Sequence, residues 1–243
     1  MVQQDMVKEM SSYFSLPTQT PITETLTQTY PKETLTPKLP WVELRFSIIG
    51  QTIPVDHGYE LYSAIAHFQS QVHDMDTLGI HTIAGIPSED GQIHLTDNSR
   101  LQIRLPVDKI SLIYPLAGKS LKIGKHTIRL GIPEIYLLEP AERLRSRIVI
   151  IQGYQEPESF LAAAQRQLEQ QGIQGKAFIT KNTDGSPKRR SIKIKRFTVV
   201  GFGLEIINLN DEDSLTLLRY GIGGKRKMGC GVFVPVKRKG NAS

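Results

Sequence analysis

The feature that most constrains the fold of this chain is an order of predicted elements, strand then helix then strand, that occurs twice. In the first occurrence, residues 41–49 alternate apolar and polar side chains, as a half-buried strand does. A helix follows from Asp56, a plausible N-cap. In the second occurrence, the strand 147–151 precedes a helix that Glu156 and Pro157 open. The apolar positions at helical spacing are Leu61, Ile65, Phe68 and Val72 in the first helix and Phe160, Ala163, Ala164 and Leu168 in the second.

Further predicted elements extend both units. In the first unit Gly79 ends the helix, and strands are predicted at 80–83, 92–95, 101–105, 121–123, 126–130 and 133–139. In the second unit, strands are predicted at 177–180, 192–196, 198–209 and 232–236, with a helix over 211–220. The second unit completes the βαββαβ order of a ferredoxin-like domain, whereas the first lacks a clear second helix. We predict an α+β fold of two tandem ferredoxin-like domains, residues 40–142 and 143–239, after a flexible Thr- and Gln-rich tail over residues 1–39.

The second domain is predicted to carry a C-terminal glycine-rich loop. This loop combines five glycines with three consecutive cations, Gly221, Gly223, Gly224, Gly229, Gly231, Lys225, Arg226 and Lys227. Glycine permits positive φ and close approach of the backbone, so successive N–H groups can point at one anion. An ATP-type phosphate loop requires Ser or Thr after Gly-Lys, and a helix after the loop. Here Arg226 follows Gly-Lys and a strand follows the loop, so the pattern favours the chain phosphates of RNA or DNA.

The charge distribution supports a nucleic-acid partner. Lys and Arg number 30 against 24 Asp and Glu, and residues 176–196 hold eight basic residues against the single acid Asp184. A solvated basic face is the alternative interpretation of this run. The residues predicted to grip an RNA stem are Lys188, Arg189, Arg190, Lys193, Lys195 and Arg196.

Composition also limits the chemistry and the compartment. Cys230 is the only cysteine, which excludes an internal disulfide, and no secretory leader or run of about 20 apolar residues occurs. We therefore expect a cytoplasmic protein without a membrane span. The motifs of zinc sites and other metal ligands are missing, so no metal or cofactor is expected. Glu60, Asp74 and Asp76 are interpreted as caps and solvated helix faces.

Four segments together resemble a known family. They are 54–65 (Pro-Val-Asp-His-Gly-Tyr-Glu-Leu-Tyr-Ser-Ala-Ile), 78–85 (Leu-Gly-Ile-His-Thr-Ile-Ala-Gly), 200–204 (Val-Gly-Phe-Gly-Leu) and the block 221–233, which follows Gly-x-Gly-Gly-Lys-Arg-x-Met-Gly-Cys-Gly-Val-Phe. This combination resembles the CRISPR-associated endoribonucleases of the RAMP superfamily that cut repeat RNA, and it is similar to the MYXAN subtype. The resemblance spans roughly residues 41–236 and leaves the tail outside.

The resemblance implies a function. Such enzymes bind the repeat of precursor CRISPR RNA and cut it without a metal, by attack of a ribose 2′-hydroxyl that leaves a 2′,3′-cyclic phosphate and a 5′-hydroxyl. The resemblance also implies a product that stays bound and other CRISPR effector subunits as partners. Two alternatives stay open: a RAMP-type subunit that holds guide RNA without cutting it, and a ferredoxin-like regulator that binds small nucleotides.

The resemblance places the catalytic histidine in the first domain, on or after the first helix. His57 is the first choice, because a helix N-terminus disfavours the imidazolium and keeps a neutral base. His81, where the chain re-enters a strand, is second, and His73, near the helix end, is third. Each has a structural alternative: a half-buried helix start, strand surface or helix end. His67, His94 and His126 are interpreted as solvated or structural, and Tyr59 and Tyr62 either orient the ribose or belong to the core.

Overall fold

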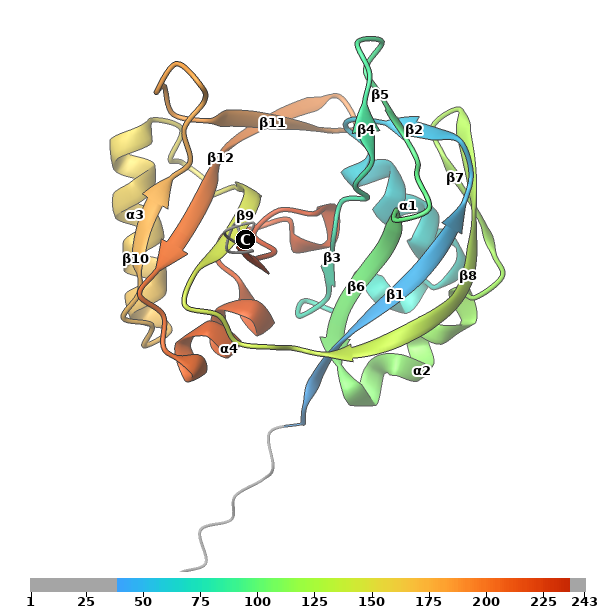
Figure 1. Ribbon diagram of the computed structural model, residues 1–243, viewed down its shortest axis with the longest axis horizontal. Helices are drawn as coiled ribbons and strands as arrows, with labels where there is room; N and C mark the ends of the chain where they lie inside the picture. Colours follow the sequence, from blue (N-terminus) through green and yellow to red (C-terminus); the bar gives the residue numbers. More distant parts are fainter. Residues whose placement is uncertain (1–38, 237–243) are drawn as a thin grey trace, which may run out of the picture. The chain divides into compact units, whose positions relative to one another are not determined.

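The computed structural model describes residues 39–236. Nearly all of the predicted tail over residues 1–39 lies outside the described residues. The described part is a mixed α+β fold with two large sheets, as predicted (Figure 1). Within residues 39–236 no helix is long and apolar enough to cross a membrane.

The first half of the described chain, β1 to β8, forms a five-stranded sheet in the order β3-β6-β1-β8-β7 with antiparallel neighbours. Its strands are β1 (Trp41–Ile49), β3 (Gly79–Ile80), β6 (Arg100–Pro106), β7 (Ser120–Ile123) and β8 (His126–Leu137). Val42, Leu44 and Phe46 are buried in the core on one face of β1. The alternate residues Glu43 and Arg45 therefore lie on the opposite face, where Glu43 is also buried. The separate strand predicted at 133–139 is the second part of β8.

Helix α1 (Gly58–Phe68) covers the core face of this sheet, with Leu61 and Ile65 buried. Its N-cap is His57 and not Asp56. Asp56 instead accepts a hydrogen bond from the backbone N–H of Lys193, so its carboxylate ties the start of α1 to the second half. The helix ends at Phe68, well before Gly79, and a 3-10 turn, η1 (Ser70–His73), follows.

The second helical element of the first half was not recognisable in the sequence. It consists of α2 (Ile110–Ile113) between two 3-10 turns, η2 (Val107–Lys109) and η3 (Tyr114–Leu116). These turns are too short to show a helical period, and Pro115 interrupts the run. A separate small sheet, in the order β2-β5-β4, is formed by β2 (Thr52–Pro54), β5 (Gln92–His94) and β4 (Ile86–Pro87).

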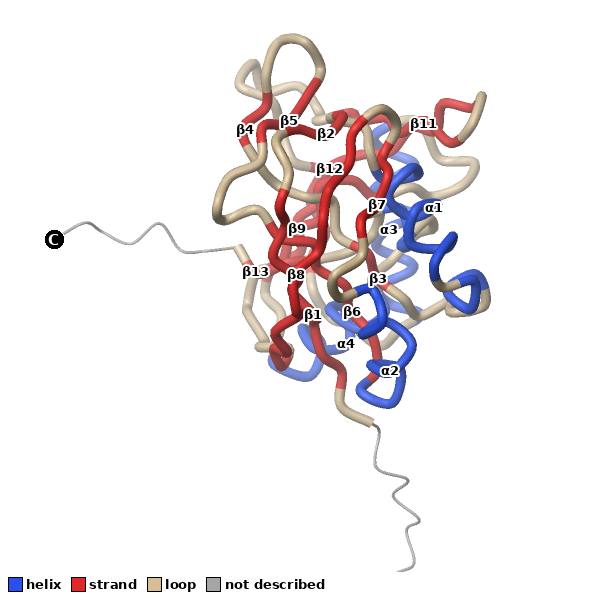
Figure 2. Tube along the Cα trace, turned by 90° about the vertical axis from the view of Figure 1, so that its right-hand side faces the viewer, coloured by secondary structure: helices blue, strands red, loops and turns tan. Residues whose placement is uncertain are grey.

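The second half has a sheet in the order β10-β12-β9-β13, and β11 also pairs with β12. Its strands are β9 (Leu144–Val149), β10 (Lys176–Ile179), β11 (Arg189–Ile194), β12 (Phe197–Ile207) and β13 (Val234–Pro235). Helices α3 (Pro157–Gln170) and α4 (Asp211–Tyr220) begin where the sequence predicts, and Asn210 caps α4 by accepting a bond from Asp213 N–H. The helices of both halves lie on the same side of the strands (Figure 2).

A buried guanidinium joins the two halves. Arg104 on β6 is 2% exposed, and its Nη1 donates to the carbonyls of Leu218 (3.0 Å) and Phe233 (2.8 Å) in the second half. Its Nη2 bonds the Glu43 carboxylate of the first half at 2.8 Å. Since a buried charge is stable only when it is paired and hydrogen-bonded, this residue depends on both halves at once.

We predict that Arg104→Met lowers the free energy of unfolding by about 3–5 kcal/mol, because it removes the hydrogen-bond donor of a buried carboxylate and of two carbonyls. Arg45→Met is the matched control. Arg45 also bonds Glu43 but is 38% exposed, so its loss should cost at most about 1 kcal/mol. Urea denaturation of both variants measures the difference, and equal losses would contradict the role given to Arg104.

Candidate functional site

The glycines of the loop serve close backbone packing. Gly221 and Gly231 have positive φ, and a Cβ on either would lie within 2.2 Å of a carbonyl oxygen of the same loop. The loop also packs on the first half: a Cβ on Gly58 would lie 2.3 Å from Met228 O, and one on Gly229 would lie 2.6 Å from the Thr82 methyl. Gly221 and Gly231 therefore let the loop fold on itself, and Gly229 and Gly58 let it lie against β3 and α1.

Most amides of these glycines are already bonded inside the protein. Gly224 N–H donates to Ile150 O at 2.9 Å, and Gly231 N–H donates to Ile148 O at 2.8 Å. The N–H groups of Gly221, Gly223 and Gly229 donate to Leu217 O, Gln167 Oε1 and Arg226 O. The expected row of glycine amides aimed at one phosphate is thus not formed. Cys230 is buried here, and burial raises the pKa of its thiol to about 12.

The side chains of the three cations of the loop have different surroundings. Lys225 is exposed and has left-handed backbone dihedrals. Arg226 donates from Nη1 to Tyr220 O, and burial, followed by the nearby Arg104 charge, lowers its pKa to about 10. Lys227 extends to the first half, where its Nζ donates to the carbonyl of His73 at 2.5 Å. Only Lys227 therefore reaches a predicted catalytic histidine through a hydrogen bond.

His57 is buried, at 1% exposed, and both of its ring nitrogens are bonded to the main chain. Nδ1 lies 2.7 Å from Pro54 O, and Nε2 accepts from Ile83 N–H at 2.9 Å. This pattern requires the neutral ring with its proton on Nδ1. Burial is the main cause that lowers the pKa of His57. In this arrangement the ring links β2 to the 81–85 segment, and neither nitrogen is open to a ribose hydroxyl.

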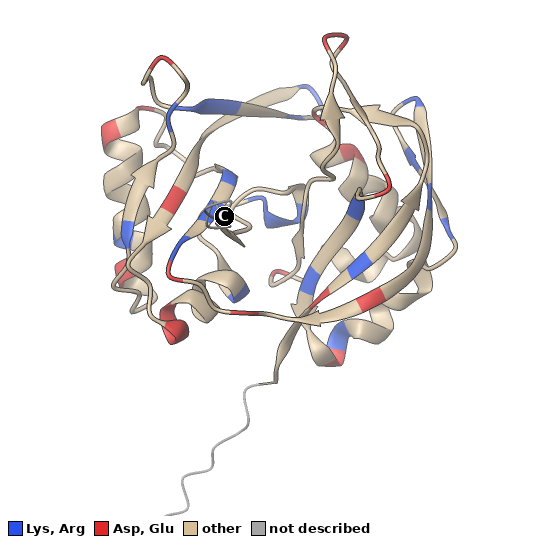
Figure 3. Ribbon diagram, viewed as in Figure 1, with Lys and Arg blue, Asp and Glu red and all other residues tan. Residues whose placement is uncertain are grey.

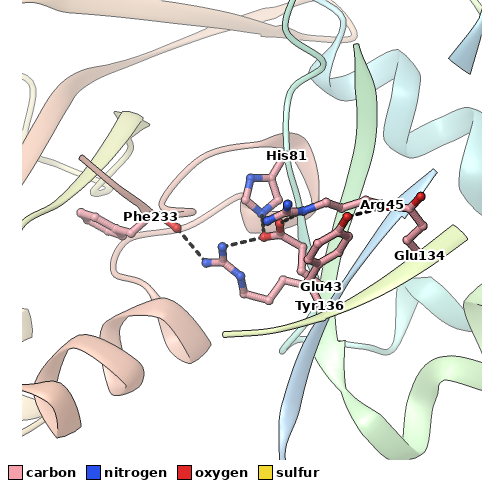
Figure 4. A network of polar contacts seen from close by, with 7 residues as sticks. Glu43, Arg45, His81, Glu134, Tyr136 and Phe233 are labelled. Carbon is pink, nitrogen blue, oxygen red and sulfur yellow. Dashed lines mark hydrogen bonds and ion pairs between the residues drawn. The ribbon is translucent and has the colours of Figure 1, made fainter. Parts of the chain in front are cut away.

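His81 belongs to a buried charge network on the face of the first sheet opposite α1 (Figure 4). Its Nε2 lies 3.1 Å from the Glu43 carboxylate, within ion-pair distance but not aligned for a hydrogen bond. Burial lowers the pKa of His81, and Glu43 opposes this effect. Burial alone would raise the pKa of Glu43, but His81 and Arg104 hold it well below its usual range, so the carboxylate stays charged. The network therefore has a structural role, because it supplies the charged partner of the buried Arg104.

His73 is the exposed histidine of the three. It ends η1, and its Nδ1 lies 2.6 Å from the hydroxyl of Tyr62 on α1, with the two rings at 88° to each other. Burial raises the pKa of Tyr62, with further contributions from Asp74 and Tyr59. The phenol therefore stays protonated at neutral pH. His73, Tyr62 and Lys227 thus combine an accessible imidazole, a fixed hydroxyl and an ammonium.

The predicted basic cluster lies on β11 and its ends (Figure 3). Arg189 and Lys193 are exposed, and Arg196 lies over the ring of Phe197 at 5.0 Å. Lys195 occupies the turn between β11 and β12 with φ 55°. Lys188 and Arg190 line a cavity of about 470 Å³ on the second sheet, together with Arg145 and Arg147. The run of basic residues therefore borders a concave surface.

Sequence reasoning missed Arg147. It lines three cavities: the one of about 470 Å³, one of about 250 Å³ beside His81 and one of about 220 Å³ beside His57. Burial and then the charge of Arg190 lower its pKa. Two guanidiniums that repel each other in one cleft form a site suited to an anion. The signal was available in the sequence, because Arg145 and Arg147 alternate along β9 and so face one side of the sheet.

The site and the fold together define a two-sheet α+β protein with a basic cleft and an exposed His–Tyr–Lys group. Residues 42–238 match the model of the family described as Cas6 Crispr. The CRISPR-associated endonuclease Cas6 of Myxococcus xanthus (strain DK1622) is 32% identical over 198 residues, covering 82% of this chain and 83% of the relative. The chain belongs to the Cas6 family, and the resemblance found in the sequence is confirmed.

Solved structures agree with this fold. One described as "CRISPR associated protein Cas6" gives a TM-score of 0.60 at 14% identity, covering 82% of this chain and 99% of the other. One described as "An RAMP protein binding different RNA substrates" gives 0.58 at 15% identity, covering 82% and 100%. A Cas6-related protein of Pyrococcus furiosus gives 0.57 at 16% identity, covering 83% and 100%. At these identities the likeness concerns the fold.

The pH dependence of stability should report the role of His57. Its folded pKa lies below 6.5, so the unfolded state binds the proton more readily, and stability is lost as pH falls below 6.5. We expect His57→Gln to reduce this loss between pH 7 and 5.5, where a single group contributes up to about 1.4 kcal/mol per pH unit. The pKa of His81 is also lowered, so in the His57→Gln variant His81 should still cause a loss of stability as pH falls.

The exposed His67 provides the matched control, since His67→Gln should leave the slope of stability against pH unchanged. Urea titrations at several pH values measure the slopes. An unchanged slope in His57→Gln would show that the ring is not held neutral by its two main-chain bonds.

Proposed function

We propose that this protein is an endoribonuclease that cuts the repeat of precursor CRISPR RNA without a metal ion, and that His73 is its general base. The observation that carries the proposal is the exposed imidazole of His73, 2.6 Å from the Tyr62 hydroxyl, with Lys227 Nζ 2.5 Å from its carbonyl. Membership of the Cas6 family, with an endonuclease as a relative, supports the reaction class.

The geometry suits attack by the RNA on itself. With its proton on Nδ1, His73 donates to the oxygen of Tyr62, and Nε2 keeps a lone pair that can take the proton of the ribose 2′-hydroxyl. The 2′-oxygen then bonds to phosphorus while the bond to the 5′-oxygen breaks, and that oxygen takes a proton from water. Lys227 uses one N–H on the His73 carbonyl, so its other two can neutralise charge on the phosphate oxygens.

This proposal changes the order of the histidines that the sequence favoured. His57, the first choice, has both nitrogens bonded to the main chain, and His81, the second, is 9% exposed and sits in the charge network of Glu43. Both are assigned structural roles here. His73, the third choice, has the exposure and the partners that proton transfer requires.

We also infer that the two halves are ferredoxin-like domains with the boundaries 40–142 and 143–239. With β7 and β11 left out, the other four strands of each large sheet, numbered along the chain, have the order 2-3-1-4 that a βαββαβ unit gives when its two helices cover one face. The short helix α2 and its 3-10 turns take the place of the second helix of the first unit.

The basic residues of β11 and the cleft around Arg147 are proposed to hold the repeat RNA before and after the cut. Phosphate contacts position RNA without reading its sequence, which fits a cleft lined by guanidiniums and ammoniums. A product that keeps these contacts stays bound, and such a complex is the form that other effector subunits could join.

The cleavage assay uses repeat RNA from the protein's own locus in EDTA, beside an RNA whose scissile 2′-hydroxyl is replaced by hydrogen. We expect one cut that the deoxy substitution abolishes. His73→Ala should slow single-turnover cleavage by about 10²–10⁴-fold, with RNA affinity little changed. Tyr62→Phe should slow it by about tenfold, through loss of one hydrogen bond.

His94→Ala is the control for His73→Ala, because His94 is exposed on β5 and contacts neither Tyr62 nor Lys227. Full activity of His73→Ala would refute the assignment of the base. Tight binding of wild-type protein without a cut would instead identify a subunit that holds guide RNA.

RNA affinity should depend on Arg147 and Arg190 through charge. Each change to Ala should weaken binding for any RNA sequence and lower the slope of log affinity against log salt by about 0.7 for single-stranded RNA. Binding titrations at several salt concentrations measure this slope. Arg166→Ala, on the exposed side of α3, is the control and should leave it unchanged.

A further inference from the structure

A groove of about 560 Å³ lies beside the proposed catalytic group, between α1 and β7. The two elements run side by side in both views (Figures 1 and 2). The residues that matter here are Tyr59, Glu60, Ser63, Phe68, Lys122 and Gly124. They supply aromatic rings, one carboxylate and one ammonium. These groups can contact a bound ligand.

The carboxylate of Glu60 is held over the turn between β7 and β8. A Cβ on Gly124 would lie 2.9 Å from Glu60 Oε2, which shows how near the carboxylate lies to this turn, and the φ of 59° at Gly124 is one that favours glycine. Within residues 39–236 the carboxylate has no hydrogen bond and no ion pair, and Lys122 lines the same groove. Its oxygens therefore remain available to a ligand that donates hydrogen bonds.

Two aromatic rings flank this carboxylate along the helix. Tyr59 is half-buried, and Phe68 is 46% exposed with its ring 5.4 Å from that of His67. Exposed aromatic faces stack nucleobases and contribute affinity that does not depend on base identity. The groove thus offers stacking surface together with one polar group that can discriminate.

The groove borders the proposed active site at Tyr59. Tyr59 and Tyr62 are three residues apart on α1 and therefore neighbours on its surface. Tyr62 bonds His73, and the charge of Tyr59 contributes to the raised pKa of Tyr62. A nucleotide adjoining the scissile phosphate would place its base in this groove.

We infer that the groove binds an unpaired guanine base next to the cut site, with Glu60 as its specificity-determining residue. This inference rests on the proposed function. Guanine presents two parallel donors, N1–H and the N2 amino group, which match the two oxygens of a carboxylate. Adenine and cytosine present one amino donor beside an acceptor, and that acceptor would face the negative charge of Glu60. Lys122 offers an ammonium to the neighbouring phosphate.

The test uses the full-length protein and repeat RNA in which each unpaired guanosine near the cut is replaced singly by inosine or by 7-deazaguanosine. Inosine lacks the N2 amino group, whereas 7-deazaguanosine keeps both donors. At one position, inosine should slow wild-type cleavage and weaken binding, about tenfold in total, and 7-deazaguanosine should have no effect. Glu60→Gln should slow cleavage of the guanosine RNA similarly and lose the guanosine-to-inosine discrimination.

Glu89→Gln, on the exposed tip of the β4–β5 hairpin, is the matched control and should discriminate like wild type. An undiminished guanosine-to-inosine ratio in Glu60→Gln, or wild-type indifference to inosine at every position, would overturn the inference. If wild-type protein cuts no RNA, the proposed function fails, but equilibrium binding of the same RNAs still decides whether Glu60 reads guanine. Equal urea denaturation midpoints for the variants would exclude misfolding as the cause.

Discussion

The pairing of Arg104 with partners from both halves is the interaction on which the rest of this structure depends. Its guanidinium binds Glu43 in the first sheet and two carbonyls, of Leu218 and Phe233, at either end of the glycine-containing segment. A guanidinium with 2% exposure cannot lose such partners without a large cost. This bond set helps to fix the relative position of the two sheets, and with it the two cavities beside His81 and His57 that Arg147 lines together with residues of the first half.

The glycine-rich loop acts through its backbone more than through its charges. Its glycines permit contacts with Gly58 and Thr82 that no side chain would allow, and these contacts place the loop against α1 and β3. As a consequence Lys227 reaches the carbonyl of His73 across the junction of the halves. The proposed catalytic group therefore combines a base from one half with a cation from the other.

Local patterns in the sequence were sufficient to predict the long helices and strands and to identify the family. Helix α4 and the β7–β8 hairpin carry clear periods and turn residues, and they were predicted within a few residues. The bonds of the histidines could not be predicted, because the partner of His57 Nε2 is the amide of Ile83, which is 26 residues away. The same limit applies to Glu60, because β7, which forms the other wall of its groove, is distant in the sequence.

The hydrogen bond between Lys227 and His73 spans 154 residues of chain. During synthesis, a ribosome that has already produced His73 and Tyr62 must add all of those residues before the ammonium exists. The imidazole thus emerges early, yet the complete catalytic group forms only once the second half has folded against the first. A chain that ends before Lys227 therefore lacks the cation of the proposed catalytic group.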